Sequence, residues 1–128
     1  MRFPVDRLLH KNPTIRSDAA KTLGEEASPE AVPYLINAFA DGHKAFSAKI
    51  VSALKKIGPV AVPQLLNALQ HENASIRSKA ALALCEIGDA QAVPALEEAV
   101  HDKNWTVRTN AIRGLGLMGP AAQHAVPL

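Results

Sequence analysis

A repeated tripeptide constrains the fold of this chain more than any other feature of its sequence. Ala-Val-Pro occurs four times in 128 residues, at spacings of 30, 31 and 33, with its prolines at Pro33, Pro63, Pro94 and Pro127. A second marker keeps the same period: an apolar residue, usually followed by arginine, stands at Ile15, Phe46, Ile76 and Val107. Self-similarity with a period of about 20 to 50 residues is the signature of stacked repeat units. We therefore expect about four equivalent units.

Each unit has the pattern of two amphipathic helices. Apolar residues recur at the spacing that places them on one face of a helix. Two such stripes, one for each helix of a unit, are Ile76, Ala80, Ala81, Leu84 and Ile87, then Val62, Leu65, Leu66 and Leu69. The pattern predicts helices near 3–11, 13–26, 29–41, 44–57, 60–72, 74–87, 90–102 and 105–118, with a further one beginning near 121.

Capping residues mark the predicted ends of these helices. Asn12, Asn73 and Asn104 stand where the first helix of a unit needs an N-cap, and Pro13 suits a first helical turn. A glycine after the first helix favours a left-handed C-terminal residue. We expect Ser28 or Asp89 to cap the second helix, and we expect the proline of each tripeptide to lie in its first turns.

These features predict an all-α, right-handed α-solenoid of about four helical hairpins, forming a single domain over 1–128. The repeats cover about 13–42, 43–72, 73–103 and 104–128, the last incomplete, and 1–12 is the remnant of a preceding second helix. Internal repeats of a solenoid expose apolar surface to both neighbours. The last helix would therefore have no partner helix to cover its apolar face. This indicates either a fragment of a longer array, which we favour, or end-to-end self-association.

The columns V/I-R-x-x-A-A-x-x-A-L-x-x-I-G, clearest from Ile76 to Gly88, and the following A-V-P resemble the HEAT-like repeat of the phycobilin-lyase type. The resemblance implies a right-handed superhelix whose second helices line a concave face. Family members serve as protein-binding scaffolds, as subunits of chromophore lyases and isomerases, and in one branch as a diiron hydroxylase. The chain departs from the pattern at Ser47, which replaces the repeat arginine, and at Ala27, which replaces the glycine.

The residues give little support for catalysis or for a cofactor. The diiron branch needs His-Glu pairs at positions that hold Ser17-Asp18 and their counterparts here, so we expect no metal site. The column His10, Asp41, His71 and Asp102 predicts a polar ladder in which the acids accept hydrogen bonds from Arg16, Arg77 or Arg108. Cys85 is the only cysteine and has no histidine partner, and its column suggests partial exposure of an inert side chain. We expect no catalytic residue and no cofactor.

The leading functional hypothesis is a non-catalytic scaffold that binds a protein or peptide on the concave face. The second helices should present the residues Tyr34, Asn37, Ala38, Asp41, Gln64, Asn67, His71, Ala95, Glu98 and Asp102, with Tyr34 as the aromatic anchor. Trp105 is either a further contact or a cover for its own hairpin. A subunit of a bilin lyase-like enzyme is the alternative that the resemblance suggests.

Charge and hydropathy restrict the other classes of partner. The formal net charge is +2, which is too small to favour nucleic acid, although Lys44, Lys49, Lys55 and Lys56 gather on one convex helix without interleaved aromatic residues. No apolar run is long enough for a signal peptide or a transmembrane helix. With one cysteine and no disulfide, the sequence favours a cytoplasmic protein without a membrane partner.

Overall fold

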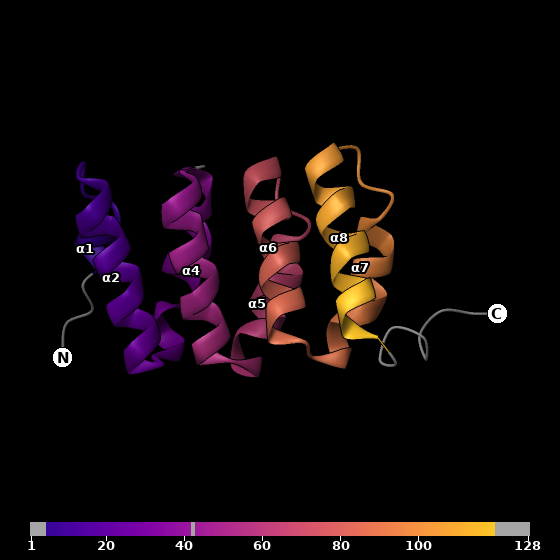
Figure 1. Ribbon diagram of the computed structural model, residues 1–128, viewed down its shortest axis with the longest axis horizontal. Helices are drawn as coiled ribbons and strands as arrows, with labels where there is room; N and C mark the ends of the chain where they lie inside the picture. The colour runs from indigo at the N-terminus through magenta and orange to yellow at the C-terminus, as the bar shows by residue number, and fades with distance from the viewer. Residues whose placement is uncertain (1–4, 42, 120–128) are drawn as a thin grey trace.

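Three helical hairpins and a fourth first helix stand side by side in the computed structural model, which describes residues 5–41 and 43–119 (Figure 1). The first helices have fourteen residues each: α2 (Pro13–Glu26), α4 (Lys44–Ile57), α6 (Ala74–Ile87) and α8 (Trp105–Met118). All four bounds agree with the sequence-based prediction. Because the described secondary structure is helical throughout and its units stack in one direction, the fold is an all-α solenoid.

The second helices are shorter than predicted. They are α3 (Val32–Ala38), α5 (Val62–Ala68) and α7 (Val93–Ala99), preceded by the 3-10 turns η1 (Pro29–Ala31), η3 (Pro59–Ala61) and η4 (Ala90–Ala92). The ranges predicted near 29–41, 60–72 and 90–102 thus each begin with a 3-10 turn, and their α-helical part is shorter than the range. In Figure 1, α5 and α7 lie behind the row of first helices.

The tripeptide proline explains why each second helix begins with a 3-10 turn. It lies in the first turn of the α-helix, where its missing N–H does no harm, as expected. The N–H that precedes it bonds three residues back, as from Val32 to the carbonyl of Pro29. After α3 the chain forms another 3-10 turn, η2 (Phe39–Asp41). The N-terminal helix α1 covers Val5–Leu8. The helix expected to begin near 121 lies outside the described residues.

The predicted N-caps are confirmed. The side-chain oxygens of Asn12, Asn73 and Asn104 accept hydrogen bonds from backbone N–H groups of α2, α6 and α8. Asp89 caps η4 by accepting from the Gln91 amide, whereas Ser28 makes no cap because its hydroxyl donates to the Glu30 carboxylate. Gly88 takes the expected left-handed conformation, and Ala27 takes it as well, with φ of 50°.

Small residues set the distance between neighbouring first helices. A Cβ on Gly24 of α2 would lie 2.6 Å from the Cα of Ala53 on α4, and a Cβ on Gly114 of α8 would lie 2.7 Å from the Cβ of Cys85 on α6. The pairs α2–α4 and α6–α8 are therefore closely packed. Between these pairs α4 and α6 pack less closely, and the Ser75 hydroxyl of α6 donates to the Phe39 carbonyl at 2.7 Å.

The expected polar ladder joins the ends of successive hairpins. Arg77 donates to both carboxylate oxygens of Asp102, and the guanidinium of Arg16 lies 3.4 Å from Asp41. Each also donates to carbonyls at the end of the preceding second helix, as Arg77 does to His71 at 2.8 Å. The ladder is interrupted at Ser47, which stands where the other repeats have arginine. Its hydroxyl is buried without a hydrogen-bond partner among the described residues.

Candidate binding groove

Three hollows follow one another along the face formed by the second helices, and together we call them the groove. The N-terminal hollow, between α1 and α3, has a volume of about 380 Å³. The central hollow, between α3 and α5, measures about 240 Å³, and the C-terminal hollow, between α5 and α7, about 210 Å³. Because every junction between second helices contributes one hollow, the groove has the period of the repeat.

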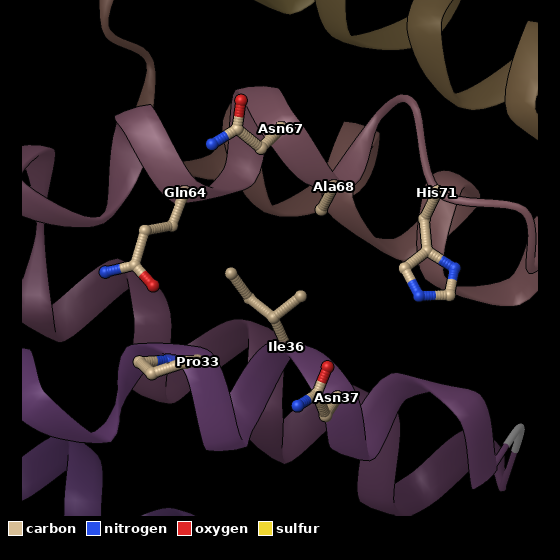
Figure 2. Close-up of a pocket in the computed structure, with 7 residues that line it drawn as sticks. All are labelled: Pro33, Ile36, Asn37, Gln64, Asn67, Ala68 and His71. Atoms are coloured by element: carbon tan, nitrogen blue, oxygen red, sulfur yellow. The ribbon is translucent and has the colours of Figure 1, made fainter.

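The helical register determines which side chains line the central hollow (Figure 2). Its lining residues are Pro33, Ile36 and Asn37 from α3 with Gln64, Asn67, Ala68 and His71 from α5 and the turn after it. Positions three and four apart lie on the same side of a helix, so each set faces the other helix. Figure 2 shows Ile36 pointing into the space between the helices, with Gln64 near the start of α5 and His71 in the turn beyond its end. The central hollow thus has an apolar floor and a rim of amides and imidazole.

The hollows on either side are more polar. The C-terminal hollow is lined by Glu98, His101 and Asp102, with Gln70 opposite. Hydrogen bonds from the Asn104 amide and the Arg77 guanidinium outweigh the desolvation of Asp102, so the pKa of this carboxyl lies below its ordinary value. The N-terminal hollow contains the cations Lys11 and Arg16 beside Asp41. The charge along the groove therefore changes from partly basic to acidic.

The predicted binding residues are only partly brought together. Asn37, Gln64, Asn67 and His71 line the central hollow, Asp41 lines the N-terminal one, and Glu98 lines the C-terminal one. Tyr34 is 48% exposed but lines none of the three hollows. Ala38, expected on the exposed stripe, is buried.

The apolar floor of the central hollow was not predicted from the sequence. It consists of Pro33, Ile36 and Ala68. The proline stood in the tripeptide as a marker of a helix start, and neither Ile36 nor Ala68 was among the residues predicted for the concave face. The available signal was the spacing of Pro33, which lies four residues before Asn37 and therefore on the same side of the helix.

A second exposed surface lies on α8. Trp105 is 73% exposed, and the guanidinium of Arg108 lies 5.8 Å from the centre of its ring. Ile112 and Leu117 are exposed on the same helix. Trp105 thus packs against an arginine of its own helix. Whether the apolar side chains of α8 support end-to-end association stays a prediction.

Cys85 is buried, contrary to the expectation of partial exposure. Its thiol packs against Gly114 and donates to the Asn110 carbonyl at 3.7 Å, while the Asn110 amide donates to the Ser78 carbonyl. Burial raises the pKa of the thiol to about 11. Within the described part of the chain, no three His, Cys, Asp or Glu side chains lie close enough to hold a metal ion.

The histidines and aspartates of the ladder are residue types that can bind a metal ion, but here they form hydrogen bonds with the backbone. His10 and His71 accept hydrogen bonds through Nδ1 from the backbone N–H groups two residues later, at 3.0 and 2.9 Å. Asp41 and Asp102 accept equivalent bonds through their carboxylates. The column therefore closes the turn after each second helix, which agrees with the polar ladder predicted from the sequence.

Comparison with known families decides the classification. The family model of HEAT repeats matches residues 62–128, which is more than half of the chain. The chain belongs to the HEAT repeat family. The PBS lyase HEAT-like repeat matches residues 15–41, so this HEAT-repeat protein is of the phycobilin-lyase type, as its sequence columns indicated. Among curated proteins, no sequence matches it at a significant level.

Solved structures with the same architecture support this classification. The complex of CpcE and CpcF of phycocyanin lyase from Nostoc sp. PCC7120 matches with 32% sequence identity and a TM-score of 0.69, over 77% of this chain. The HEAT-repeat chain spans 62% of the length of the matched subunit. An engineered protein matches 95% of this chain and 66% of its own, at 20% identity and a TM-score of 0.52, and shows the fold alone. Within residues 5–41 and 43–119, no helix is both long and apolar enough to cross a bilayer.

Proposed function

We propose that this HEAT-repeat protein is a non-catalytic scaffold that binds a segment of another protein in the groove. The row of three hollows on the second-helix face carries the proposal. The side-chain amides of Asn37, Gln64 and Asn67 are exposed there and make no hydrogen bond with the described residues. Each amide offers two donors and an acceptor, which is the chemistry needed to bind a polypeptide backbone.

The shape of the groove also favours a polypeptide. Hollows of about 210 to 380 Å³ lie below or near the lower limit of about 300 Å³ for pockets that enclose a drug-sized ligand, and each can accept one side chain. An apolar floor surrounded by polar groups is the usual composition of a protein–protein contact. A ligand that spans several junctions would gain one contact from each repeat.

The proposal is tested with the double variant Asn37→Ala, Asn67→Ala. Purified wild type and variant are used to capture partners from a native extract, and captured proteins are quantified by mass spectrometry. We expect at least one partner to be lost from the variant while its helical circular dichroism is unchanged, because both side chains are exposed. The matched control is Lys49→Ala, Ser52→Ala on the outer face of α4, which should retain that partner. Equal recovery by the groove variant would contradict the proposal.

The likeness to a phycocyanin lyase complex supports a second candidate, a subunit of a bilin lyase-like enzyme. That complex matches most of this chain at 32% identity. A linear tetrapyrrole added to purified protein would change its absorption spectrum on binding, because the protein fixes the conformation of the pigment. An unchanged spectrum at high protein concentration would count against this candidate.

Nucleic-acid binding is less well supported. The lysines of α4, namely Lys44, Lys49, Lys55 and Lys56, are exposed on the side of the array opposite the groove. Single-stranded nucleic acid is usually bound by aromatic side chains interleaved with cations. The exposed aromatic residues Tyr34 and Trp105 lie on other helices.

A further inference from the structure

Three equivalent second helices differ at the positions that face the groove. Their sequences are Val-Pro-Tyr-Leu-Ile-Asn-Ala in α3, Val-Pro-Gln-Leu-Leu-Asn-Ala in α5 and Val-Pro-Ala-Leu-Glu-Glu-Ala in α7. The asparagine of the first two becomes Glu98 in the third. The groove therefore presents two neutral amides, Asn37 and Asn67, followed by a carboxylate at the same structural position.

The hollows beside these residues differ in the same way. The central hollow has a floor of Pro33, Ile36 and Ala68, which suits an apolar side chain. The C-terminal hollow contains the carboxylates of Glu98 and Asp102, which suit a cation. An apolar subsite is thus followed, one repeat further along, by an acidic subsite.

Charged groups around the C-terminal hollow leave it with a negative excess. Asp102 is paired with Arg77, so these two charges offset each other. Glu98 is exposed and forms no ion pair with the described residues, and Glu97 lies beside it on α7. His101 also lines the hollow, and Lys103 follows Asp102 in the turn. Of the two carboxylates that line the hollow, that of Glu98 is therefore left without a paired cation.

The distance between the subsites matches an extended chain. Packed helices lie about 8–10 Å apart, so equivalent positions on α5 and α7 repeat at about that distance. An extended polypeptide in the polyproline II conformation has three residues per turn and rises about 3.1 Å per residue, so side chains three residues apart lie on the same side, about 9 Å from each other. A chain that crosses the second helices meets an equivalent subsite at every third residue.

We infer that the occupant of the groove is an extended peptide segment, in the polyproline II conformation, with an apolar residue and a lysine or arginine three positions apart. The apolar side chain enters the central hollow, the cation enters the C-terminal hollow beside Glu98, and the amides of Gln64 and Asn67 bind the backbone between them. This specificity rests on the proposed scaffold function and adds the chemistry of its ligand.

The test is a selection from a displayed library of random twelve-residue peptides on the full chain. We expect enriched peptides to contain an apolar residue and a Lys or Arg at a separation of three, in either order. The variant Glu98→Lys should instead enrich Asp or Glu at the same separation. A peptide selected on the wild type should bind this variant about fivefold or more weakly. Glu86→Lys on the outer face of α6 is the matched control and should keep the wild-type preference.

The outcomes separate this inference from the function on which it rests. Enrichment of peptides without a basic residue, or with another separation, would overturn the inference and leave peptide binding intact. Apolar residues at helical spacing would identify a helix as the occupant and would also overturn it. A selection that enriches no peptide would count against both the inference and the groove as a peptide-binding site.

Discussion

Replacement of Arg77 tests whether the polar ladder holds the ends of the groove together. The Arg77 side chain is 7% exposed and makes four hydrogen bonds, two to Asp102 and two to the carbonyls of His71 and Glu72. In Arg77→Met the two carbonyls can accept hydrogen bonds from water instead. Asp102, whose side chain is 14% exposed, loses its counter-ion. Removal of one partner of a buried ion pair costs about 3–5 kcal/mol, and we take about 3 because Asp102 retains some solvent.

This loss of stability should be measurable by thermal unfolding and by urea unfolding. With an unfolding entropy of about 2.1 cal/mol/K per residue, 3 kcal/mol lowers the Tm by about 11 °C. Far-ultraviolet circular dichroism and Trp105 fluorescence follow the transition, and Arg113→Met, an exposed arginine on α8, is the matched control with an expected change within about 0.5 kcal/mol. A loss below about 1 kcal/mol would refute the stabilising role of the ladder.

The pH dependence gives a second measurement of the same pair. The pKa of Asp102 is lowered in the folded state, so its contribution is present above the unfolded value of about 3.9 and is lost as the pH falls through the folded pKa. The difference in stability between the wild type and Arg77→Met should therefore decrease below about pH 4. A difference that stays constant to lower pH would show that the cost comes from packing and not from the ion pair.

Four further expectations follow from the described geometry. Ala27→Gly should stabilise the fold by about 0.5–1 kcal/mol in urea unfolding, since φ of 50° strains any residue with a Cβ; a destabilised variant would contradict this. Ser47→Ala should add about 1 kcal/mol in the same assay, because it removes a buried hydroxyl without a partner, and a loss would mean that the hydroxyl is hydrogen-bonded. Alkylation of Cys85 near pH 8 should be about a hundredfold slower than in denaturant, since burial raises its pKa from 9.0 to about 11, and equal rates would refute its burial. Light scattering should show concentration-dependent association that Ile112→Glu abolishes, and a monomer at every concentration would exclude association through α8.

Most ends of the first helices could be predicted because they are specified locally, whereas α4, whose N-cap residue His43 makes no side-chain cap, was placed by the repeat period. An asparagine cap such as Asn73 fixes the start, and a residue in the left-handed region such as Gly88 fixes the end. The ladder followed from one column of arginines and one of acids, since the fixed period places members of the two columns in contact. Family membership followed from the same columns.

Features that depend on the distance between repeats could not be predicted. Cys85 is buried because Gly114 lets α8 approach α6, and a column alignment does not contain that distance. Tyr34 was assigned to the binding face because it is opposite the core stripe. Only the position of α5 shows that Ile36 and Asn37 face the central hollow while Tyr34 faces elsewhere.

Gly24 and Gly114 set the dimensions of the groove from the opposite face of the array. Each lets a neighbouring first helix approach so closely that no Cβ would fit between them, and the spacing of the first helices determines the spacing of the repeats that carry the second helices. Neither glycine lines one of the three hollows of the groove. A larger residue at either position would therefore change the separation of adjacent hollows without altering any residue that touches a ligand.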